Sequence, residues 1–425
     1  MRNVSNATWG ECHHMSKINA SKTYKDRAKA AANKAAAFGE DIDLSAFTSE
    51  AEPQSYRADA SQLPSQAKEQ MLGVGVMLDD IRQRAGTYIQ TNNTPVHTSA
   101  TQEGIEVMAV SQAMKKYDWL SDYFWKAVAV DTDKYTASVE LGQYDGYFFR
   151  ALPGAKAEYP VQACLYLAKA QLAQKVHNII IAEEGSELHI ITGCTTALRE
   201  EPGLHIGISE FFIKRGAKVT FTMIHSWNPA TAVRPRTVAI VEENGLFLSN
   251  YVLMRPVRSL QMYPAARCVG ENAIVRFNSI LVTGEGSSID VGSRVFLNAR
   301  GSRTEILARA ITTGGNIISR GYIEGNAPDV KGHLECRGLI LSEKGMIHAI
   351  PELKGNLAGV DLSHEAAVGK IAEEEVEYLM ARGLTRAEAT ATIVRGFLRV
   401  DIEGLPPMLA AEMRRAVETS EKELM

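Results

Sequence analysis

A repeated unit of one tight turn and one short strand occupies the middle of this chain and limits the folds open to it. The early copies lie about 30 residues apart and the later ones about 15. A lone strand of this length cannot bury its apolar face, so successive units have to stack. The copies begin at Glu184-Gly185, Arg215-Gly216, Glu243-Asn244 and Glu271-Asn272, and further ones begin at Gly286, Gly301, Gly315, Gly332 and Gly345.

Two architectures fit strands that alternate in polarity between regular turns, a parallel β-helix and a β-sandwich. The near-absence of proline from Ala265 to Asn326, together with the uniform turns, favours the β-helix. Glycine suits the turns because it accepts a positive φ without steric cost. The sequence therefore predicts a mainly β protein.

The flanks of the repeat have helix-forming sequences. Residues 16–38 are alanine-rich, and residues 66–83 and 101–117 have apolar residues at three- and four-residue spacing. We therefore expect an N-terminal helical region over residues 1–130, a β-helix core over 131–361 and a C-terminal helical domain over 362–425.

The C-terminal domain is expected to hold three helices. The first covers residues 372–382, and Gly383 ends it. Thr385-Arg386-Ala387-Glu388 is a capping box that opens the second, which runs to about Val400, and Pro406 and Pro407 start a third. An apolar stripe on the second helix either packs on its neighbours or docks a partner: Ala389, Ile393, Phe397 and Val400.

Composition excludes several classes of protein. The 425 residues have a net charge of −4 and no Lys/Arg-rich run, which argues against binding nucleic acid. We find no apolar stretch long enough to span a membrane and no signal-peptide core after Met1, so we expect a cytoplasmic protein. The sequence also lacks a P-loop, a G-x-S-x-G elbow and an H-E-x-x-H motif.

Candidate metal ligands gather near the C-terminal end of the repeat. His333-Leu334-Glu335-Cys336 belongs to a strand-like run, and Ser363-His364-Glu365 follows about one long repeat later. Iron and zinc both accept a thiolate, imidazoles and a carboxylate. Strand alternation places Leu334 and Cys336 on one face and His333 and Glu335 on the other. The alternative is a buried cysteine and a helix-initiating Ser-His-Glu.

A second candidate group lies earlier in the repeat. Cys194 ends one unit and His225-Ser226-Trp227 ends the next, 31 residues later, so Cys194 and His225 could stack inside the solenoid. They would form either a relay or simple filling. We expect His189 and His205 to be ordinary sheet residues.

Motifs distributed over roughly residues 80 to 420 resemble those of SufB and SufD, the paired scaffold proteins of the SUF iron–sulfur cluster assembly system. The matching residues are Phe148-Phe149, Leu152-Pro153-Gly154, Pro160, Glu184-Gly185-Ser186, Gly193-Cys194-Thr195, His225-Ser226-Trp227, His333-x-x-Cys336, Ser363-His364-Glu365-Ala366, Gly383-Leu384, Glu388-Ala389 and Ile393-Val394-x-Gly396-Phe397. The pattern departs from bacterial SufB at His225-Ser226, where Gln-Asn is usual, and at Tyr166 and Ala168, where Arg and Asn are usual.

The resemblance implies a right-handed parallel β-helix between helical domains, acting as an assembly scaffold rather than an enzyme. It implies that sulfur and iron meet at Cys336 and Glu365 at a scaffold dimer interface to form a transient iron–sulfur cluster. His333 and His364 would be further ligands, and Cys194 would accept sulfur and pass it along the β-helix. The presence of Cys336 makes the chain more similar to SufB than to SufD.

The partners implied are a SufC-like ABC ATPase docked on residues 385–400, a sulfur donor, and a second scaffold chain in a homodimer or a heterodimer. ATP hydrolysis is expected in the ATPase partner. The alternatives are a SufD-like structural partner without its own cluster, and a β-helix enzyme acting on polysaccharide.

Overall fold

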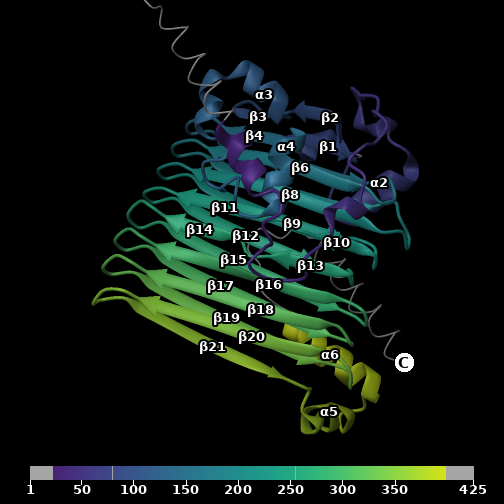
Figure 1. The fold of residues 1–425 in the computed structure, drawn as a ribbon. Helices are drawn as coiled ribbons and strands as arrows, with labels where there is room; N and C mark the ends of the chain where they lie inside the picture. Colours follow the sequence, from purple (N-terminus) through teal and green to yellow (C-terminus); the bar gives the residue numbers. More distant parts are fainter. Residues whose placement is uncertain (1–22, 79, 254, 399–425) are drawn as a thin grey trace, which may run out of the picture.

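The structure, a computed structural model, describes residues 23–78, 80–253 and 255–398. Its centre is a parallel β-solenoid of about eight coils, in which two sheets face each other (Figure 1). Within each sheet, neighbouring solenoid strands pair in parallel and come from successive coils. The β-helix prediction is confirmed, and the sandwich alternative is wrong.

In the described part of the chain, the two sheets contain ten and eleven strands. The first sheet consists of β2 (Thr94–Ala100), β1 (Gly86–Thr91), β5 (Val161–Leu167), β7 (Glu187–Thr196), β9 (Lys218–Ser226), β12 (Leu246–Leu253), β15 (Ile274–Thr283), β17 (Arg303–Thr312), β19 (Lys331–Ile340) and β21 (Asp361–Gly369). The second consists of β3 (Ile105–Ala109), β4 (Tyr147–Ala151), β6 (Ala173–Ala182), β8 (Gly203–Ile213), β11 (Arg236–Val241), β10 (Thr231–Val233), β13 (Ser259–Met262), β14 (Ala265–Cys268), β16 (Ser288–Leu297), β18 (Asn316–Gly325) and β20 (Met346–Gly355).

One coil contributes to both sheets, which explains the two spacings in the sequence. Paired residues in neighbouring coils are 27 to 31 positions apart, and about half of that distance separates a strand from the next one on the opposite sheet. Gly185 and Gly216 occupy equivalent corners with φ of 68° and 66°. The Gly185 N–H donates to the carbonyl of Arg215 in the next coil, so the turns stack as the strands do.

The main core fills the space between the sheets. Alternate residues of each strand point inward, and aromatic rings from neighbouring strands pack in tilted or edge-to-face pairs near the middle of the solenoid. The ring of Phe211 lies 4.8 Å from Phe221 and 5.1 Å from Phe247, and Phe247 lies 5.9 Å from Phe277. Burial of such rings is the main source of stability for a stacked coil.

From residue 23 onward, where the structure describes it, the N-terminal region is less helical than predicted. The helices and 3₁₀ turns before the solenoid are 23–30, η1 (Leu44–Ala46), η2 (Ala60–Gln62), α2 (Ser65–Leu72), η3 (Ile81–Gln83), α3 (Val110–Lys116), η4 (Asp118–Asp122) and α4 (Lys134–Gly142). The prediction of one helix over 101–117 is wrong in its first half. Ile105, Val107 and Ala109 are buried at alternate positions of β3, which pairs antiparallel with β4.

The predicted helix over 66–83 also ends early, because the chain makes a turn at residues 73–75 directly after Leu72. Gly75 has φ of 79°, which a continuing helix does not allow. Val74 then crosses the outer face of the first sheet so closely that a Cβ at Gly193 would overlap it. The segment 74–78 is therefore largely buried and covers the outer face of β7 at Gly193.

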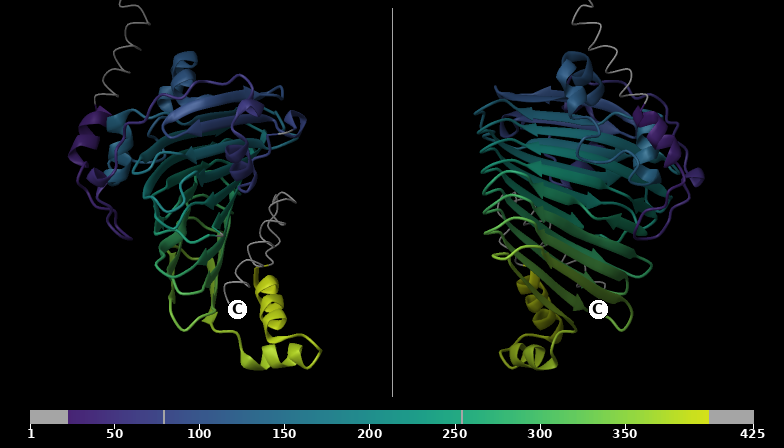
Figure 2. Two further views of the ribbon diagram at one scale, coloured as in Figure 1. Left: turned by 90° about the vertical axis from the view of Figure 1, so that its right-hand side faces the viewer. Right: turned by 60° about the vertical axis from the view of Figure 1, so that its left-hand side comes forward.

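The C-terminal helices lie beside the last coils of the solenoid (Figure 2). They are α5 (Glu373–Met380) and α6 (Arg386–Leu398). The capping box is confirmed, since the Thr385 N–H donates to Glu388 Oε2 at 2.8 Å and the Glu388 N–H donates to Thr385 Oγ1 at 3.3 Å. The predicted third helix and Val400 lie outside the described residues.

The inner face of α6 packs on the outer face of the first sheet. Val394 and Leu398 are buried against Ile280, Val282 and Ile311 of β15 and β17. Packing on neighbours therefore accounts for this side of the helix.

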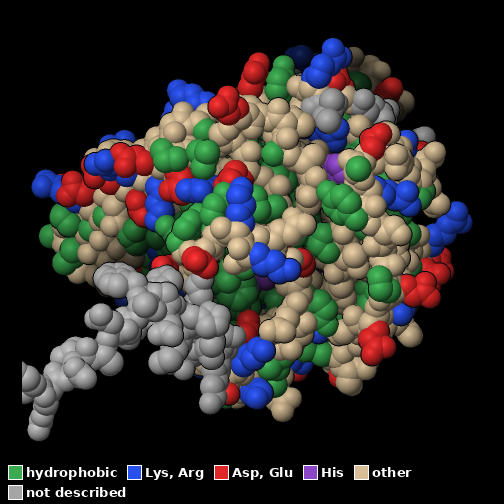
Figure 3. Space-filling model, turned by 90° about the horizontal axis from the view of Figure 1, so that it is seen from above, with side chains coloured by type: hydrophobic (Ala, Val, Ile, Leu, Met, Phe, Trp, Pro, Cys, Tyr) green, Lys and Arg blue, Asp and Glu red, His purple; other side chains and the backbone are tan. Residues whose placement is uncertain are grey.

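The surface at the N-terminal end carries both signs of charge. On the face seen from above, Lys/Arg and Asp/Glu side chains are interspersed (Figure 3). Among the described helices, none combines the length and apolarity that crossing a membrane requires.

Candidate functional site

Strand β19 divides its side chains between the two faces of the sheet, as predicted. Leu334 and Cys336 are buried in the main core, whereas His333 and Glu335 face outward and are partly exposed. The Cys336 sulfur lies 3.9 Å from the Ser319 hydroxyl oxygen of the opposite sheet. Burial raises the pKa of Cys336, although the Ser319 hydroxyl opposes this, so the thiol is the resting form.

Strand β21 brings the Ser-His-Glu motif beside β19. His364 lies opposite Leu334, and Glu365 lies opposite Glu335. The alternative that Ser363 to Glu365 begins a helix is therefore wrong, because the motif continues the sheet for one more coil. The long repeat made this adjacency predictable.

The pairing places Cys336 and Glu365 on opposite faces. A Cβ at Gly332 would meet Leu362, and one at Gly338 would meet Val368, so the even-numbered residues of β21 share the inner face. His364 thus lies on the same face as Cys336, and Glu365 lies on the outer face. The structure does not bring Cys336 and Glu365 into one ligand set.

On the outer face of the sheet, Glu365 lies in a second group of possible ligands. Ligand atoms of His333, Glu335 and Glu365 lie within 4.8 Å of one another. His333 Nδ1 is 2.9 Å from the Ser363 hydroxyl, and Arg337 binds Glu365 at 3.1 Å and Glu335 at 3.3 Å. Sequence reasoning did not propose Glu335 as a ligand, although its place opposite Glu365 follows from the repeat.

Arginines neutralise this outer group. Glu335 also forms an ion pair with Arg309 of β17, and both side chains are only about one-tenth exposed. A metal ion bound by Glu335 would have to replace these partners. The outer group is therefore arranged as an ion-pair network in which Glu365, at 57% exposure, is the accessible carboxylate.

The last coil is open to solvent. Strands β20 and β21 each pair with a described strand on one side only, and most of β21 is exposed. Large apolar side chains are uncovered there, with Met346 46% exposed, Leu357 51% and Val368 41%. The solenoid thus ends in two unpaired strand edges and an uncovered interior, beside Cys336.

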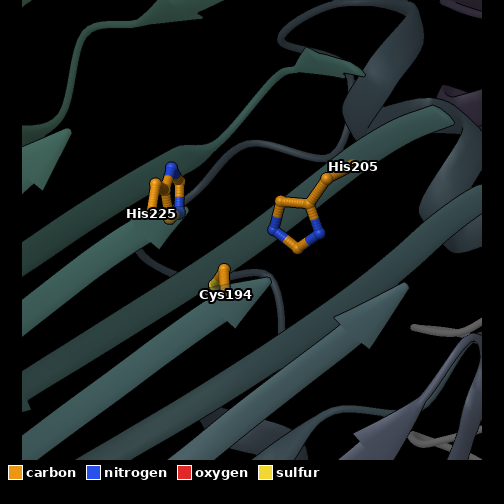
Figure 4. A group of neighbouring side chains, drawn as sticks. All are labelled: Cys194, His205 and His225. Atoms are coloured by element: carbon orange, nitrogen blue, oxygen red, sulfur yellow. The ribbon is translucent and has the colours of Figure 1, made fainter. Parts of the chain in front are cut away.

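The second candidate group lies deep in the solenoid. Cys194 of β7 and His225 of β9 are directly paired, as the repeat predicted. His205, expected to be an ordinary sheet residue, lies on β8 of the opposite sheet, and its side chain extends toward both of them (Figure 4). Its sequence position gave no sign of this, since it depends on how the two sheets face each other. His189 is partly exposed on β7, outside this group.

The register connects the two groups through the core. In the column that ends at Cys336, the preceding positions are Ala308, Ser279 and Tyr251. The Tyr251 hydroxyl forms a hydrogen bond with His225 Nδ1 at 2.9 Å. This column therefore begins beside the group of Cys194, His205 and His225. The residues closest to Cys336 in it have small side chains.

Sequence comparisons assign this architecture to a known family. Residues 165–397 match the family described as SUF system FeS cluster assembly, SufBD core domain. An iron–sulfur cluster assembly SufBD family protein of Methanothermobacter thermautotrophicus is 50% identical over 402 residues, which cover 93% of this chain and 98% of the relative. One from Archaeoglobus fulgidus is 54% identical over 358 residues, covering 84% and 96%. The iron–sulfur cluster assembly protein SufB of Bacillus subtilis is 28% identical over 368 residues, covering 84% and 78%.

Proposed function

This chain belongs to the SufBD family of the SUF iron–sulfur cluster assembly system, and we propose that within that system it is a scaffold that builds a transient cluster at Cys336 and Glu365. Members of the family act as assembly scaffolds rather than catalysts. The observation that carries the proposal is the position of Cys336. This buried thiol lies on β19, the strand that pairs with β21 of the exposed last coil. The cluster is the cargo of this site.

The candidate ligands differ in whether they lie on the same face of the sheet as Cys336. Cys336 and His364 share the inner face and together offer a thiolate and an imidazole, both good ligands for iron. Glu365 lies on the outer face, held by Arg337. We therefore propose that β21 moves relative to β19 when the cluster forms, so that Glu365 joins Cys336. His333 stays with the outer network and is the weakest of the four candidates.

The open end supports a second scaffold chain as partner. Unpaired strand edges bind other strands readily, and exposed Met346, Leu357 and Val368 provide apolar area for the contact. A second SufB- or SufD-type chain that continues the solenoid would cover Cys336 and His364 and bring its own ligands to them. We propose that the complete site forms only at this interface, in either a homodimer or a heterodimer.

The C-terminal helices support an ATPase partner. A groove between α5 and α6 is lined by Glu374, Glu375, Tyr378, Leu379 and Ile393, and Tyr378 is 56% exposed. The opposite side of α6 packs on β15 and β17, two strands of the sheet that contains β19. Docking of a SufC-like ATPase on residues 385–400 would thus act on the sheet that carries Cys336. ATP-driven movement of the helices is the proposed source of the β21 shift.

Cys194 is the proposed entry point for sulfur from a donor protein. The thiol is fully buried, and burial raises its pKa. The column from Tyr251 through Ser279 and Ala308 offers a direction toward Cys336.

Anaerobic reconstitution with ferrous iron and sulfide tests the assembly site. Wild-type protein should develop the visible absorbance of an iron–sulfur cluster, and Cys336→Ala should lose it. Cys268→Ala is the matched control, since Cys268 is another buried core cysteine, on β14. Full cluster formation by Cys336→Ala would refute the site.

A further inference from the structure

An isolated group of polar side chains occupies the apolar interior between β7, β8 and β9. Cys194, His205 and His225 are each at most 2% exposed, and their ligand atoms lie within 4.8 Å of one another (Figure 4). The Trp227 ring closes the group, with its centroid 5.1 Å from that of His205 and 5.7 Å from that of His225.

Hydrogen bonds fix the tautomer of His205. The Gln174 amide nitrogen donates to the backbone carbonyls of Asn92 and Tyr166, at 2.9 Å and 3.2 Å. The Gln174 oxygen is therefore the atom that faces His205 Nδ1, at 2.9 Å, and it can only accept. Nδ1 carries the proton, which leaves the lone pair on Nε2 free. An imidazole oriented in this way by an outer amide is typical of metal-ligating histidines.

His225 has a nitrogen without a partner. Its Nδ1 pairs with the Tyr251 hydroxyl at 2.9 Å, whereas its Nε2 is buried and makes no hydrogen bond among the described residues. Buried nitrogens without a partner are rare because they lose their hydration without compensation. The arrangement leaves one nitrogen of each imidazole available beside the Cys194 sulfur.

We propose that Cys194, His205 and His225 bind one divalent transition-metal ion, of the zinc or ferrous class. One thiolate and two imidazoles form a three-ligand set typical of tetrahedral sites, with a fourth position open to a small exogenous ligand. Metal–sulfur and metal–nitrogen bonds of about 2.3 Å and 2.0–2.1 Å place the ligand atoms about 3.5 Å apart. Side-chain rotations that bring the three atoms roughly 1 Å closer complete the site.

Burial affects the thiol and the two imidazoles in opposite ways, because it disfavours the thiolate and favours the neutral imidazole. Burial raises the pKa of Cys194 and lowers the pKa of His225 well below its usual value, and it lowers that of His205 to about 3. All three groups are therefore neutral without an ion. Binding the ion displaces the thiol proton, and the thiolate then offsets part of the ion's charge within the core.

Metal binding at Cys194 would affect the proposed delivery of sulfur, but the metal site does not depend on that delivery. While the ion is bound, the Cys194 sulfur is a ligand and is blocked from accepting sulfur, so the ion and the proposed sulfur donor compete for one atom. The two sites are separable, because Cys336 lies several coils away along the first sheet.

Titration of the chelator-treated full chain with Co²⁺ tests the site. Wild-type protein and Cys336→Ala should each bind one ion here, with the strong visible bands of tetrahedral cobalt and a sulfur-to-cobalt charge-transfer band. Cys194→Ala should lose the charge-transfer band, and His225→Gln, which keeps a partner for Tyr251, should bind at least about 100-fold more weakly. Cys268→Ala is the matched control and should behave as wild type.

Bands that persist unchanged in Cys194→Ala would overturn the proposal. A measurement that leaves Cys194, His205 and His225 unchanged covers the case in which variants of these residues fold poorly. X-ray absorption of the Zn²⁺-loaded Cys336→Ala and wild-type chains should show one sulfur and two imidazole nitrogens around the ion. A shell of oxygen atoms only would equally overturn it. Neither result depends on cluster formation at Cys336, so failure here leaves the proposed function standing.

Discussion

Cys336 and Glu365 occupy neighbouring positions on adjacent strands, yet they face opposite sides of the sheet. Direct pairing joins Glu335 to Glu365 and Cys336 to Ala366. A ligand set that includes both Cys336 and Glu365 thus requires β21 to slide or turn at the sheet edge. The exposed last coil is the part of the solenoid in which such a change meets the least resistance.

Replacing each carboxylate of the outer network should separate assembly from stability. Glu365→Gln removes one exposed ion pair, so we expect a loss of unfolding free energy below about 1 kcal/mol and a clear loss of cluster yield. Glu335→Gln leaves the nearly buried Arg309 without its partner, and we expect a loss of about 3 kcal/mol. Urea denaturation and anaerobic reconstitution measure the two effects. Equal stability losses in both variants would contradict the assignment of Glu365 as the accessible ligand.

Charges placed on the open end should prevent pairing of scaffold chains. Val368→Asp and Met346→Asp each put a carboxylate into the proposed interface, where it would lose water without gaining a partner. We expect chain–chain affinity to fall about 100-fold, measured by light scattering over a dilution series. Val269→Asp is the matched control, since Val269 is 48% exposed between β14 and β15, and it should leave affinity unchanged.

The two sides of α6 should respond differently to a charge. Ile393 is partly exposed and lines the groove with Tyr378 and Leu379, so Ile393→Asp should abolish ATPase binding while the melting temperature stays the same. Val394 is buried against β15 and β17, so Val394→Asp should lower the melting temperature. Calorimetric titration with the cognate ATPase and thermal unfolding check the pair. Normal ATPase binding by Ile393→Asp would place the docking surface elsewhere.

The buried Glu140 and the partly buried Glu106 should give pH dependences of opposite sign. Burial raises the pKa of Glu140 above 4.5, despite a hydrogen bond from Trp125. The folded state thus binds the proton more tightly than the unfolded state. The free energy of unfolding therefore falls as pH rises from 4.5 through the raised pKa of Glu140. Glu140→Gln should remove that loss, so its stability relative to wild type should be higher at pH 7 than at pH 4.

Glu106 is the matched comparison for this measurement. Burial opposes ionisation of Glu106, but hydrogen bonds from Tyr117 and Lys116 and the charge of Arg150 outweigh it and lower the pKa below 4.5. Its contribution is present above pH 4.5 and disappears as pH falls through the lowered pKa. Glu106→Gln should therefore destabilise the protein at pH 7 and have little effect in strong acid. Denaturant unfolding between pH 4 and pH 7 measures both effects. If the stability of the two variants relative to wild type changed in the same direction with pH, both assignments would be contradicted.

The solenoid was predictable because its signal is local and repeated. Turns such as those at Gly185 and Gly216 recur once per coil, and alternation within one strand correctly separated Cys336 from Glu335. The same period placed Glu365 beside β19. Each of these inferences uses only the distance along the chain and the two faces of a strand.

Contacts between sheets and across the N-terminal end could not be predicted in this way. His205 lies near Cys194 only because β8 faces β7 and β9 across the core. The spacing of residues along the chain does not predict which side chains of the two sheets meet. Helical periodicity over residues 66–83 was misleading, since Val74 is buried by the sheet beneath it rather than by a helix face. Tertiary packing decided both cases.

The uncovered last coil also has a thermodynamic consequence. In a stacked array, each interior unit is stabilised by two neighbours, whereas a terminal unit has only one. Strand β21, which carries Glu365 and pairs with β19 on one side only, should therefore fray first, and its amide protons should exchange faster than those of β12 or β15. A bound scaffold chain would supply the missing neighbour, so the order of these strands would depend on the concentration of that chain. Assembly of the complex and completion of the fold would then be one equilibrium.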